Sequence, residues 1–144
     1  MNVSEKKRLG DWYAGVYGEG APDSNQWRLL MQRNEAEPVT IVNFFKMREV
    51  VGCAGEASVS GQEAFARYSA VSMPALAAVG GEFLMVSPFE GSFVGEAEDW
   101  DLIAIGRYPC ANAVFELFAD EDYKKAYEHR VAACAKQRVM FAGS

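Results

Sequence analysis

The chain has 144 residues, of which 50% are hydrophobic and 24% are charged, and its formal net charge is −6. This length and composition fit one globular domain with a buried core. The negative charge argues against a nucleic-acid partner or an anionic membrane, because both repel an acidic surface. No apolar run approaches the roughly 20 residues that span a bilayer, and the N-terminus lacks the apolar core of a secretory signal, so we expect a cytoplasmic protein.

Residues 1–37 differ in composition from the remainder, and we treat residues 38–144 as the main domain. The N-terminal segment is rich in glycine, yet aromatic residues such as Trp12 and Tyr13 make it unlike a disordered tail. A turn, a capping side chain and apolar residues spaced three to four apart predict a short helix at 24–34. Two roles are open: an extension packed on the main domain, or an arm that lies on a partner subunit or closes a pocket.

The main domain reads as alternating strands and helices, beginning with a strand rich in β-branched and aromatic residues. Ser60 and Glu63 form a capping-box pattern, and Asp120 begins a helix with two more acids in its first turn. The predicted elements are a strand at 39–48, a loop at 49–59, a helix at 61–79, a strand at 82–86 with a continuation past Pro88 to Val94 left open, a strand at 100–108, a short helix at 111–118, a helix at 120–138 and a strand at 138–141. This β-α-β-β-α-β order predicts an α+β, ferredoxin-like protomer with an antiparallel sheet.

The first predicted strand is apolar on both faces. Ile41 and Phe45 alternate with Val42 and Phe44, and the strand at 100–108 repeats the pattern. A sheet that helices cover on one side alternates between apolar and polar residues. The second face therefore needs a cover, either the N-terminal segment or a second subunit, and we favour a homodimer joined sheet to sheet.

The helix at 120–138 carries a stripe of unusual composition. At 3.6 residues per turn, Tyr123, Tyr127, Arg130 and Cys134 fall on one face, which we take as the inward face. His129, the single histidine, falls on the other side and is expected to face solvent. That placement argues against haem ligation or general-base catalysis by the histidine.

The sequence offers no recognisable metal or phosphate motif. Cys53, Cys110 and Cys134 are far apart and form no C-x-x-C pair, so neither a zinc site nor a disulfide is predicted. No glycine-rich loop continues into a phosphate-binding Gly-Lys-Ser/Thr, and no G-x-S-x-G elbow occurs. We therefore predict no metal and no cofactor.

Arg130 requires a partner, because an unpaired charge on a buried face is costly. One interpretation is structural, with the guanidinium held by Glu82, Glu90 or Asp101, or by backbone carbonyls. The other is functional, with the guanidinium holding an anionic substrate through two hydrogen bonds. Both stay open, and structural ion pairs are the more common finding.

Other polar groups lie on otherwise apolar elements and extend the set of candidates. A single tyrosine among them is more often a core aromatic with its hydroxyl at the boundary. Together they describe an apolar pocket with a few polar groups, suited to a small aromatic or carboxylate compound that tyrosine or asparagine orients. The candidate ligand-binding residues are Arg130, Tyr68, Tyr127, Asn43, Tyr123, Ser72 and Arg107.

Three stretches of the main domain resemble a known family. They are VTIVNFFKMR, EAFARYSAVSMPALAAVGG, and DEDYKKAYEHRVAACAK before RVMF, with a proline ahead of Gly-Gly and a tyrosine seven residues before an arginine. Residues 39–142 resemble a domain-of-unknown-function family of dimeric α/β-barrel proteins. The resemblance implies a ferredoxin-like protomer and a homodimer whose two sheets close one barrel. Residues 1–37 fall outside it, and Cys110 stands where a capping serine is more usual.

The resemblance implies no activity. The wider superfamily includes cofactor-free monooxygenases, muconolactone isomerase and haem-dependent enzymes, so the fold does not choose among them. Our first hypothesis is a homodimer that binds a small organic acid or aromatic molecule, with cofactor-independent catalysis left open. The alternative is a non-catalytic dimerisation or interaction module in which Arg130 is purely structural.

Overall fold

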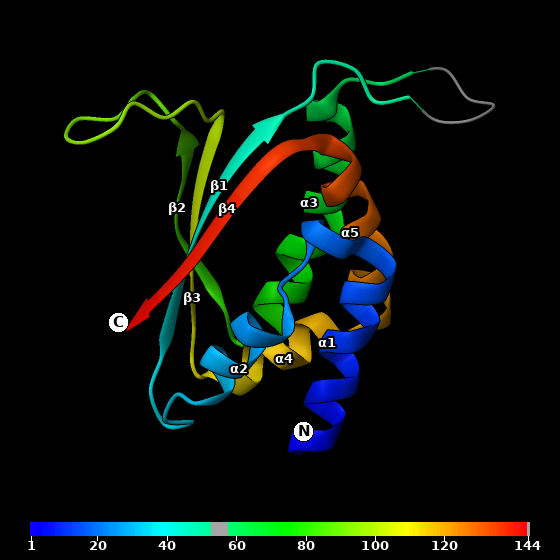
Figure 1. The fold of residues 1–144 in the computed structure, drawn as a ribbon, viewed down its shortest axis with the longest axis vertical. Coiled ribbons are helices and arrows are strands. Elements are labelled where there is room, and N and C mark those ends of the chain that lie inside the picture. Colours follow the sequence, from blue (N-terminus) through cyan, green and yellow to red (C-terminus); the bar gives the residue numbers. More distant parts are fainter. Residues whose placement is uncertain (53–57, 144) are drawn as a thin grey trace.

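The computed structural model describes residues 1–52 and 58–143, so Cys53 and part of the predicted 49–59 loop lie outside the described residues. The elements are α1 (Val3–Tyr17), η1 (Gly18–Gly20), α2 (Ser24–Met31), β1 (Val39–Met47), α3 (Gly61–Ala78), β2 (Glu82–Pro88), β3 (Leu102–Tyr108), α4 (Ala111–Ala119), α5 (Glu121–Ala133) and β4 (Cys134–Gly143). The four strands form an antiparallel sheet in the order β2-β3-β1-β4 (Figure 1). The α+β, ferredoxin-like prediction is confirmed.

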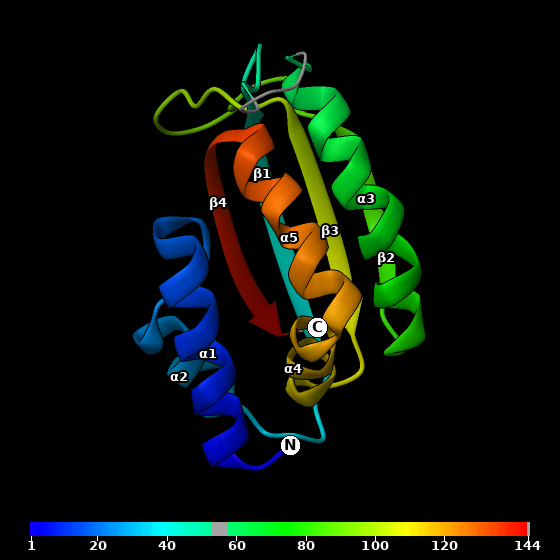
Figure 2. The same ribbon diagram turned by 90° about the vertical axis from the view of Figure 1, so that its right-hand side faces the viewer.

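All helices lie on one side of the sheet, as two views at right angles show (Figures 1 and 2). Cross-strand pairs fix which residues share a face: Asn43 lies opposite both Ala104 and Val139. This inner face points toward the helices. The outer face carries Val42 and its neighbours, among them Met140. No described helix covers it, and at one end Phe89 and Trp100 pack against Phe44.

The N-terminal segment packs on the helices instead of on the outer face. The hydroxyl of Tyr13 donates to the Phe118 carbonyl at 2.6 Å, and that of Tyr17 donates to the Lys124 carbonyl at 2.6 Å. Tyr13 is completely buried. One expected alternative, that this segment covers the second face of the sheet, is therefore wrong.

The helix α1 was not predicted, although the short helix after it was. Asn2 caps α1 by accepting a hydrogen bond from the Glu5 amide, and one face of the helix is buried against the domain. Glycine at positions 10 and 15 lowers helix propensity, which hid the element in the sequence. At Gly10 the missing side chain is required, because a Cβ there would lie 2.8 Å from the Trp27 ring.

Several predicted boundaries differ from the observed ones. The helix α2 ends at Met31 and not near Asn34, and β3 begins at Leu102 and not at Trp100. β2 ends at Pro88, so the continuation to Val94 that was left open does not occur. The largest difference concerns the last helix, which ends at Ala133 instead of Arg138. Residues 134–143 pair with the central strand β1 along almost its whole length, and this backbone pairing outweighs their helix propensity.

The hydrophobic core lies largely among the helices and consists of interlocking aromatic rings. Tyr13, Tyr123, Tyr127 and Phe115 are the largest fully buried side chains in the described part of the chain, together with Val39. The Tyr13 ring meets the Tyr127 ring edge-on at 5.3 Å. Within the described residues, no helix is both long and apolar enough to cross a bilayer.

Candidate functional site

A cavity of about 560 Å³ lies between the inner face of the sheet and the helices. That volume is typical of pockets for small molecules. Its floor is formed by β1, β3 and β4, and α3 and α5 form the roof. The N-terminal segment contributes a further wall through η1 and α2, from Glu19 to Pro22 and at Trp27 and Leu30.

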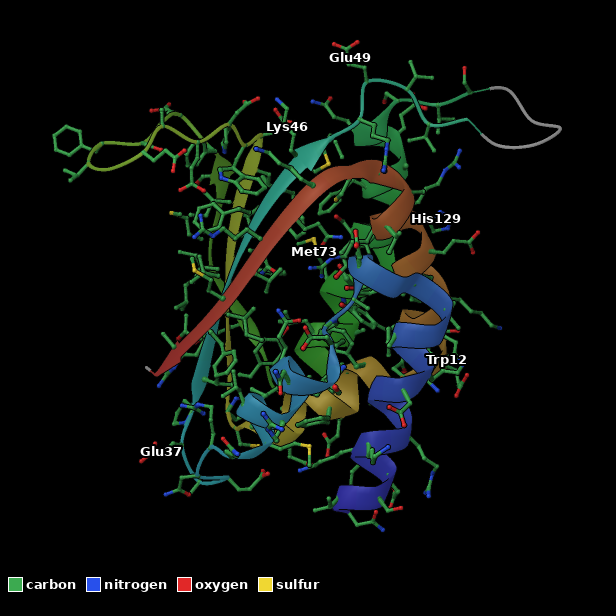
Figure 3. The ribbon with its side chains drawn as sticks, viewed as in Figure 1. Trp12, Glu37, Lys46, Glu49, Met73 and His129 are labelled. Carbon is green, nitrogen blue, oxygen red and sulfur yellow. The ribbon has the colours of Figure 1, made fainter. Side chains whose placement is uncertain are left out.

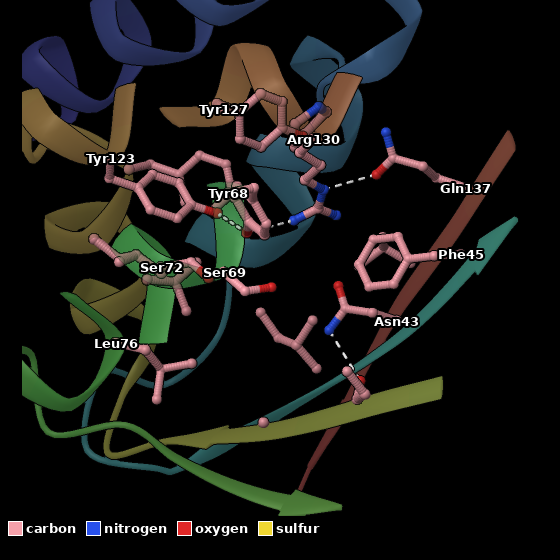
Figure 4. Close-up of a pocket in the computed structure, with 18 of the residues that line it drawn as sticks. Asn43, Phe45, Tyr68, Ser69, Ser72, Leu76, Tyr123, Tyr127, Arg130 and Gln137 are labelled. Atoms are coloured by element: carbon pink, nitrogen blue, oxygen red, sulfur yellow. Dashed lines mark hydrogen bonds between the residues drawn. The ribbon is translucent and has the colours of Figure 1, made fainter. Parts of the chain in front are cut away.

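Arg130 extends from the last turn of α5 into this cavity and is only 6% exposed. Its Nε donates to Oε1 of Gln137 at 2.8 Å, and its Nη1 donates to the Tyr68 hydroxyl at 3.1 Å (Figure 4). Both acceptors are neutral. The hydrogen bonds therefore orient the guanidinium without neutralising its charge.

Aromatic rings enclose the guanidinium. Its central carbon lies 4.9 Å from the ring centre of Phe45, 5.1 Å from that of Tyr127 and 5.5 Å from that of Tyr68. Ring faces attract a cation, and the attraction strengthens where water is excluded. This aromatic cage accounts for how a charge is tolerated at such a buried position.

The carboxylates expected to pair with Arg130 in the structural interpretation lie elsewhere. Asp101 pairs with Lys46 at 3.2 Å, and both Glu82 and Glu90 are exposed. Among the residues that the structure describes, no Asp or Glu forms an ion pair with Arg130, and none accepts a hydrogen bond from its Nη2. The guanidinium keeps hydrogen-bonding capacity on the side of the cavity.

The hydrogen-bond pattern indicates which way the Tyr68 hydroxyl points. Its oxygen accepts from Arg130 and lies 2.8 Å from the hydroxyl of Tyr123. Tyr123 is 1% exposed, and Tyr68 is its hydroxyl's sole partner in the described chain. A buried donor left unpaired is costly, so Tyr123 donates to Tyr68. The Tyr68 hydrogen then remains free to donate to a group in the cavity.

Apart from the exposed Glu19, the cavity is lined at neutral pH by one fixed cation and several neutral phenols. Burial raises the pKa of the Tyr123 hydroxyl, and burial likewise raises the pKa of Tyr127 although Arg130 opposes it. Burial lowers the pKa of Arg130, but the surrounding tyrosines raise it by more, so the guanidinium stays charged.

Most of the predicted candidates meet in this cavity. Asn43 donates through Nδ2 to the Ala104 carbonyl at 3.0 Å, which leaves its Oδ1 available as an acceptor. Ser72 is buried in the α3 wall. Tyr127 contributes only its ring, because its hydroxyl donates to the Gly20 carbonyl at 2.7 Å. Tyr123 lies behind Tyr68 and supports it.

Two side chains lie apart from the cavity. Arg107 is exposed on the outer face of β3, opposite Thr40, so its inclusion among the cavity residues was wrong. His129 lies on the far side of α5 from the sheet (Figure 3), half-buried beside α3 and not fully in solvent as expected.

Sequence reasoning missed Gln137 and Phe45 as neighbours of Arg130. Gln137 was assigned to the predicted helix at 120–138. In the structure it belongs to β4, where it lies opposite Phe45 on β1. The same error put Cys134 on the helix, whereas it is the first residue of β4. Burial raises the pKa of its thiol to about 11, so the thiol is protonated and unreactive.

The described residues contain no cluster of three or more His, Cys, Asp or Glu side chains suited to a metal ion. Cys110 and Cys134 are free thiols. The groups in the cavity that could bind a ligand are therefore the Arg130 guanidinium, the Tyr68 hydroxyl as a donor and the Asn43 Oδ1 as an acceptor, surrounded by apolar walls.

Comparison with known proteins identifies similar structures of unknown function. The methylated RPA0582 protein has 25% sequence identity and a TM-score of 0.79, over 90% of this chain and 96% of that chain. A second structure of RPA0582, from Rhodopseudomonas palustris, has 27% identity and a TM-score of 0.77, over 85% and 94%.

Two further structures are more distant. One is a dimeric protein of unknown function with a ferredoxin-like fold from Bacteroides fragilis, at 10% identity and a TM-score of 0.48, over 74% of this chain and 96% of that chain. The other is SnoaB, a cofactor-independent oxygenase from Streptomyces nogalater, at 19% identity and a TM-score of 0.46, over 76% of this chain and 94% of that chain. Similarity at that level supports no conclusion about this chain.

No curated protein matches the sequence. A family model, described as a domain of unknown function, matches residues 53–144, which is more than half of the chain. The predicted resemblance to a domain-of-unknown-function family is confirmed, and the chain belongs to the DUF1330 family.

Proposed function

We propose that this protein binds a small organic anion with an aromatic or other apolar body, and that Arg130 holds the anionic group. The observation that carries the proposal is a guanidinium, 6% exposed, with no carboxylate partner among the described residues. An uncompensated buried charge costs several kcal/mol, about the scale of a ligand's binding energy. A ligand carboxylate would neutralise that charge and gain strong charge-assisted hydrogen bonds.

The surroundings of Arg130 favour a carboxylate over a larger anion. Nη1 and the Tyr68 hydroxyl lie 3.1 Å apart, close enough to serve the two oxygens of one carboxylate or a single oxygen jointly. Asn43 offers Oδ1 across the cavity, which suits a hydroxyl or amine donor on the ligand. Leu76, Ile41 and Phe65 line the cavity with apolar surface for the remainder of the molecule.

We state the function as binding and assign no reaction. Among the described lining residues, Glu19 is the one carboxylate, and no histidine lines the cavity. A proton-transfer reaction needs a base within reach of the substrate. Tyr68 can donate a proton, but apart from the exposed Glu19 no described lining residue is a carboxylate or histidine that could act as a base.

We also propose that the protein is a homodimer joined through the outer face of the sheet. The outer patch, as we name it, consists of Val42, Phe44, Met85, Ile103, Ile105 and Met140. Met85 is 38% exposed and Met140 is 45% exposed, and the other four are half-buried. A contiguous apolar surface of this kind is typical of an interface, and an antiparallel sheet without a partner has a polar second face.

The binding proposal is tested by thermal unfolding in the presence of matched pairs of compounds. The panel contains benzoate with benzamide, phenylacetate with phenylacetamide, and hexanoate with hexanamide. We expect at least one carboxylate to raise the melting temperature while its amide does not, because a ligand that binds only the folded state stabilises it. The Arg130→Gln variant should lose this response, whereas Arg107→Gln, a change of the same kind on the outer face, should keep it.

Two outcomes contradict the binding proposal. In one, every carboxylate behaves like its amide. In the other, the Arg130→Gln variant responds as strongly as the unchanged protein. Either result, combined with a dimer in sedimentation, favours the alternative of a dimerisation module in which Arg130 is structural.

A further inference from the structure

The loop between β2 and β3 presents two apolar side chains to solvent. Phe93 is 101% exposed and Val94 is 88% exposed, more than any other large hydrophobic side chain in the described residues. Isolated exposed apolar residues are common, so the informative feature is that these two are adjacent and lie at one loop tip. The loop projects from the sheet on the side opposite the helices, which is the side of the outer patch (Figure 1).

This loop is held by specific bonds and is not a loose connection. The Glu98 amide donates to the Ser92 side chain at 3.0 Å, which closes the tip. Gly95 has φ +93°, a left-handed conformation that a side chain would strain. At the base, the Phe89 amide donates to the Asp101 carbonyl at 3.1 Å. The structure thus fixes Phe93 in an outward position.

The area of the sheet leaves room for a second contact. Four strands about 4.8 Å apart, at about 3.3 Å per residue, cover roughly 500 Å² in plan. A stable dimer buries about 800 Å² on each partner. The outer face is therefore of modest size for a dimer interface, and a projecting loop on the same side supplies additional contact surface.

Charge also favours a second copy as the partner of this loop. Exposed carboxylates of Glu90 and Glu96 flank the tip, whereas Lys136 and Arg138 lie along the outer face of β4. Arg138 already pairs with Glu98 of its own chain at 2.6 Å, so of these two cations only Lys136 lacks a carboxylate partner among the described residues. An acidic loop with an apolar tip is complementary to an apolar patch with a basic margin. A two-fold axis places each loop against the other copy, so the contact forms twice.

We infer that the β2–β3 loop is a dimerisation arm whose Phe93 and Val94 pack against the second copy in the homodimer. This inference rests on the proposed sheet-to-sheet dimer. It adds that the sheet alone does not hold the dimer, and that the tip contributes a substantial part of the affinity.

Analytical ultracentrifugation of the full chain tests this inference with three variants. Phe93→Ser/Val94→Ser removes the apolar tip and keeps the bonds that shape the loop. Met140→Asp places a charge in the outer patch, and Leu29→Ser removes an exposed leucine of α2 on the helical side as a control. We expect the tip variant to raise the dimer dissociation constant about tenfold or more, Met140→Asp to raise it further, and Leu29→Ser to leave it unchanged. Circular dichroism confirms that each variant is folded.

The outcomes separate the two ideas. If Met140→Asp dissociates the dimer and the tip variant does not, the sheet dimer stands and the arm is refuted. If the tip variant dissociates the dimer and Met140→Asp does not, the loop is an interface but the proposed sheet dimer, and with it the arm as an addition to that dimer, is refuted. A monomeric unchanged protein at concentrations of about 100 µM, roughly a hundred-thousandfold above nanomolar dissociation constants, overturns both.

Discussion

Replacing Arg130 with methionine should leave the ligand-free protein about as stable as before while it removes anion binding. Methionine is unbranched and adaptable, so it fills the space of the arginine stem without the charge. The substitution loses two hydrogen bonds from a charged group, at about 1.5 kcal/mol each. It also loses cation–π attraction of about 2 kcal/mol in the aromatic cage. Against these losses stands the desolvation penalty of the charge, several kcal/mol, which the substitution relieves.

Because the lost interactions of the guanidinium and the relieved desolvation penalty are of similar size, we expect the free energy of unfolding to change by less than about 1 kcal/mol. The partners left behind do not alter the result. Tyr68 retains its hydrogen bond to Tyr123, and Gln137 is only half-buried and can bind water. Urea denaturation at neutral pH, monitored by tryptophan fluorescence, measures the difference. A loss of about 3–5 kcal/mol is the usual result of breaking a compensated buried pair, and it would refute our view that Arg130 lacks a charged partner.

The remaining predictions concern stability. Gly10→Ala should destabilise the protein by about 1–3 kcal/mol through overpacking, since the new Cβ meets the buried Trp27 ring at 2.8 Å. A Cβ at Gly15 in the same helix would meet nothing within 4 Å, so Gly15→Ala should stabilise the protein by up to about 1 kcal/mol. Equal effects of the two substitutions in urea denaturation would contradict the close contact between Gly10 and Trp27. The backbone N–H of Met47, 2.8 Å from Asp101, holds the pKa of that carboxyl below its usual value. Its stabilisation is present above the ordinary carboxyl pKa of about 4 and is lost as the pH falls through the lower folded pKa. The free energy of unfolding of Asp101→Asn should therefore fall less steeply with decreasing pH than that of the unchanged protein. Equal pH dependence in the two proteins would contradict this role of Asp101.

The sequence predicted the order of elements because each main-domain strand and helix carries a clear local signal. The Ser60 cap accepts from the Glu63 amide at 3.0 Å, and Asp120 caps α5 by accepting from the Tyr123 amide at 2.9 Å. Both caps depend only on residues three positions apart, which is the range in which sequence patterns are informative.

The end of α5 could not be predicted in this way. Residues 134–138 contain neither glycine nor proline, and their composition is compatible with a helix. They form a strand because β1 offers an unpaired edge, which is a long-range cause. The same cause places Gln137 beside Arg130, so the error in the element became an error in the site.

The candidate site was partly predictable, because a polar residue on an apolar element is visible in the sequence. Arg130, Tyr68 and Asn43 were recognised on that basis, and the structure brings them to one cavity. Arg107 met the same criterion and lies on the other face. A residue at the end of a strand has one chance in two of facing the cavity, since successive side chains alternate.

The N-terminal segment belongs to the cavity as much as the main domain does. The Tyr127 ring contacts the guanidinium at 5.1 Å, and its hydroxyl donates to Gly20 in η1 at 2.7 Å, so one side chain joins the aromatic cage to this segment. The family model begins only at residue 53, after β1, yet the RPA0582 structure corresponds to 90% of the chain. That correspondence must extend through β1 and into much of the N-terminal segment. A fragment that began at residue 38 would keep the sheet and Arg130 but would open the cavity on the side of η1 and α2. We therefore propose that the segment and the main domain form one binding unit.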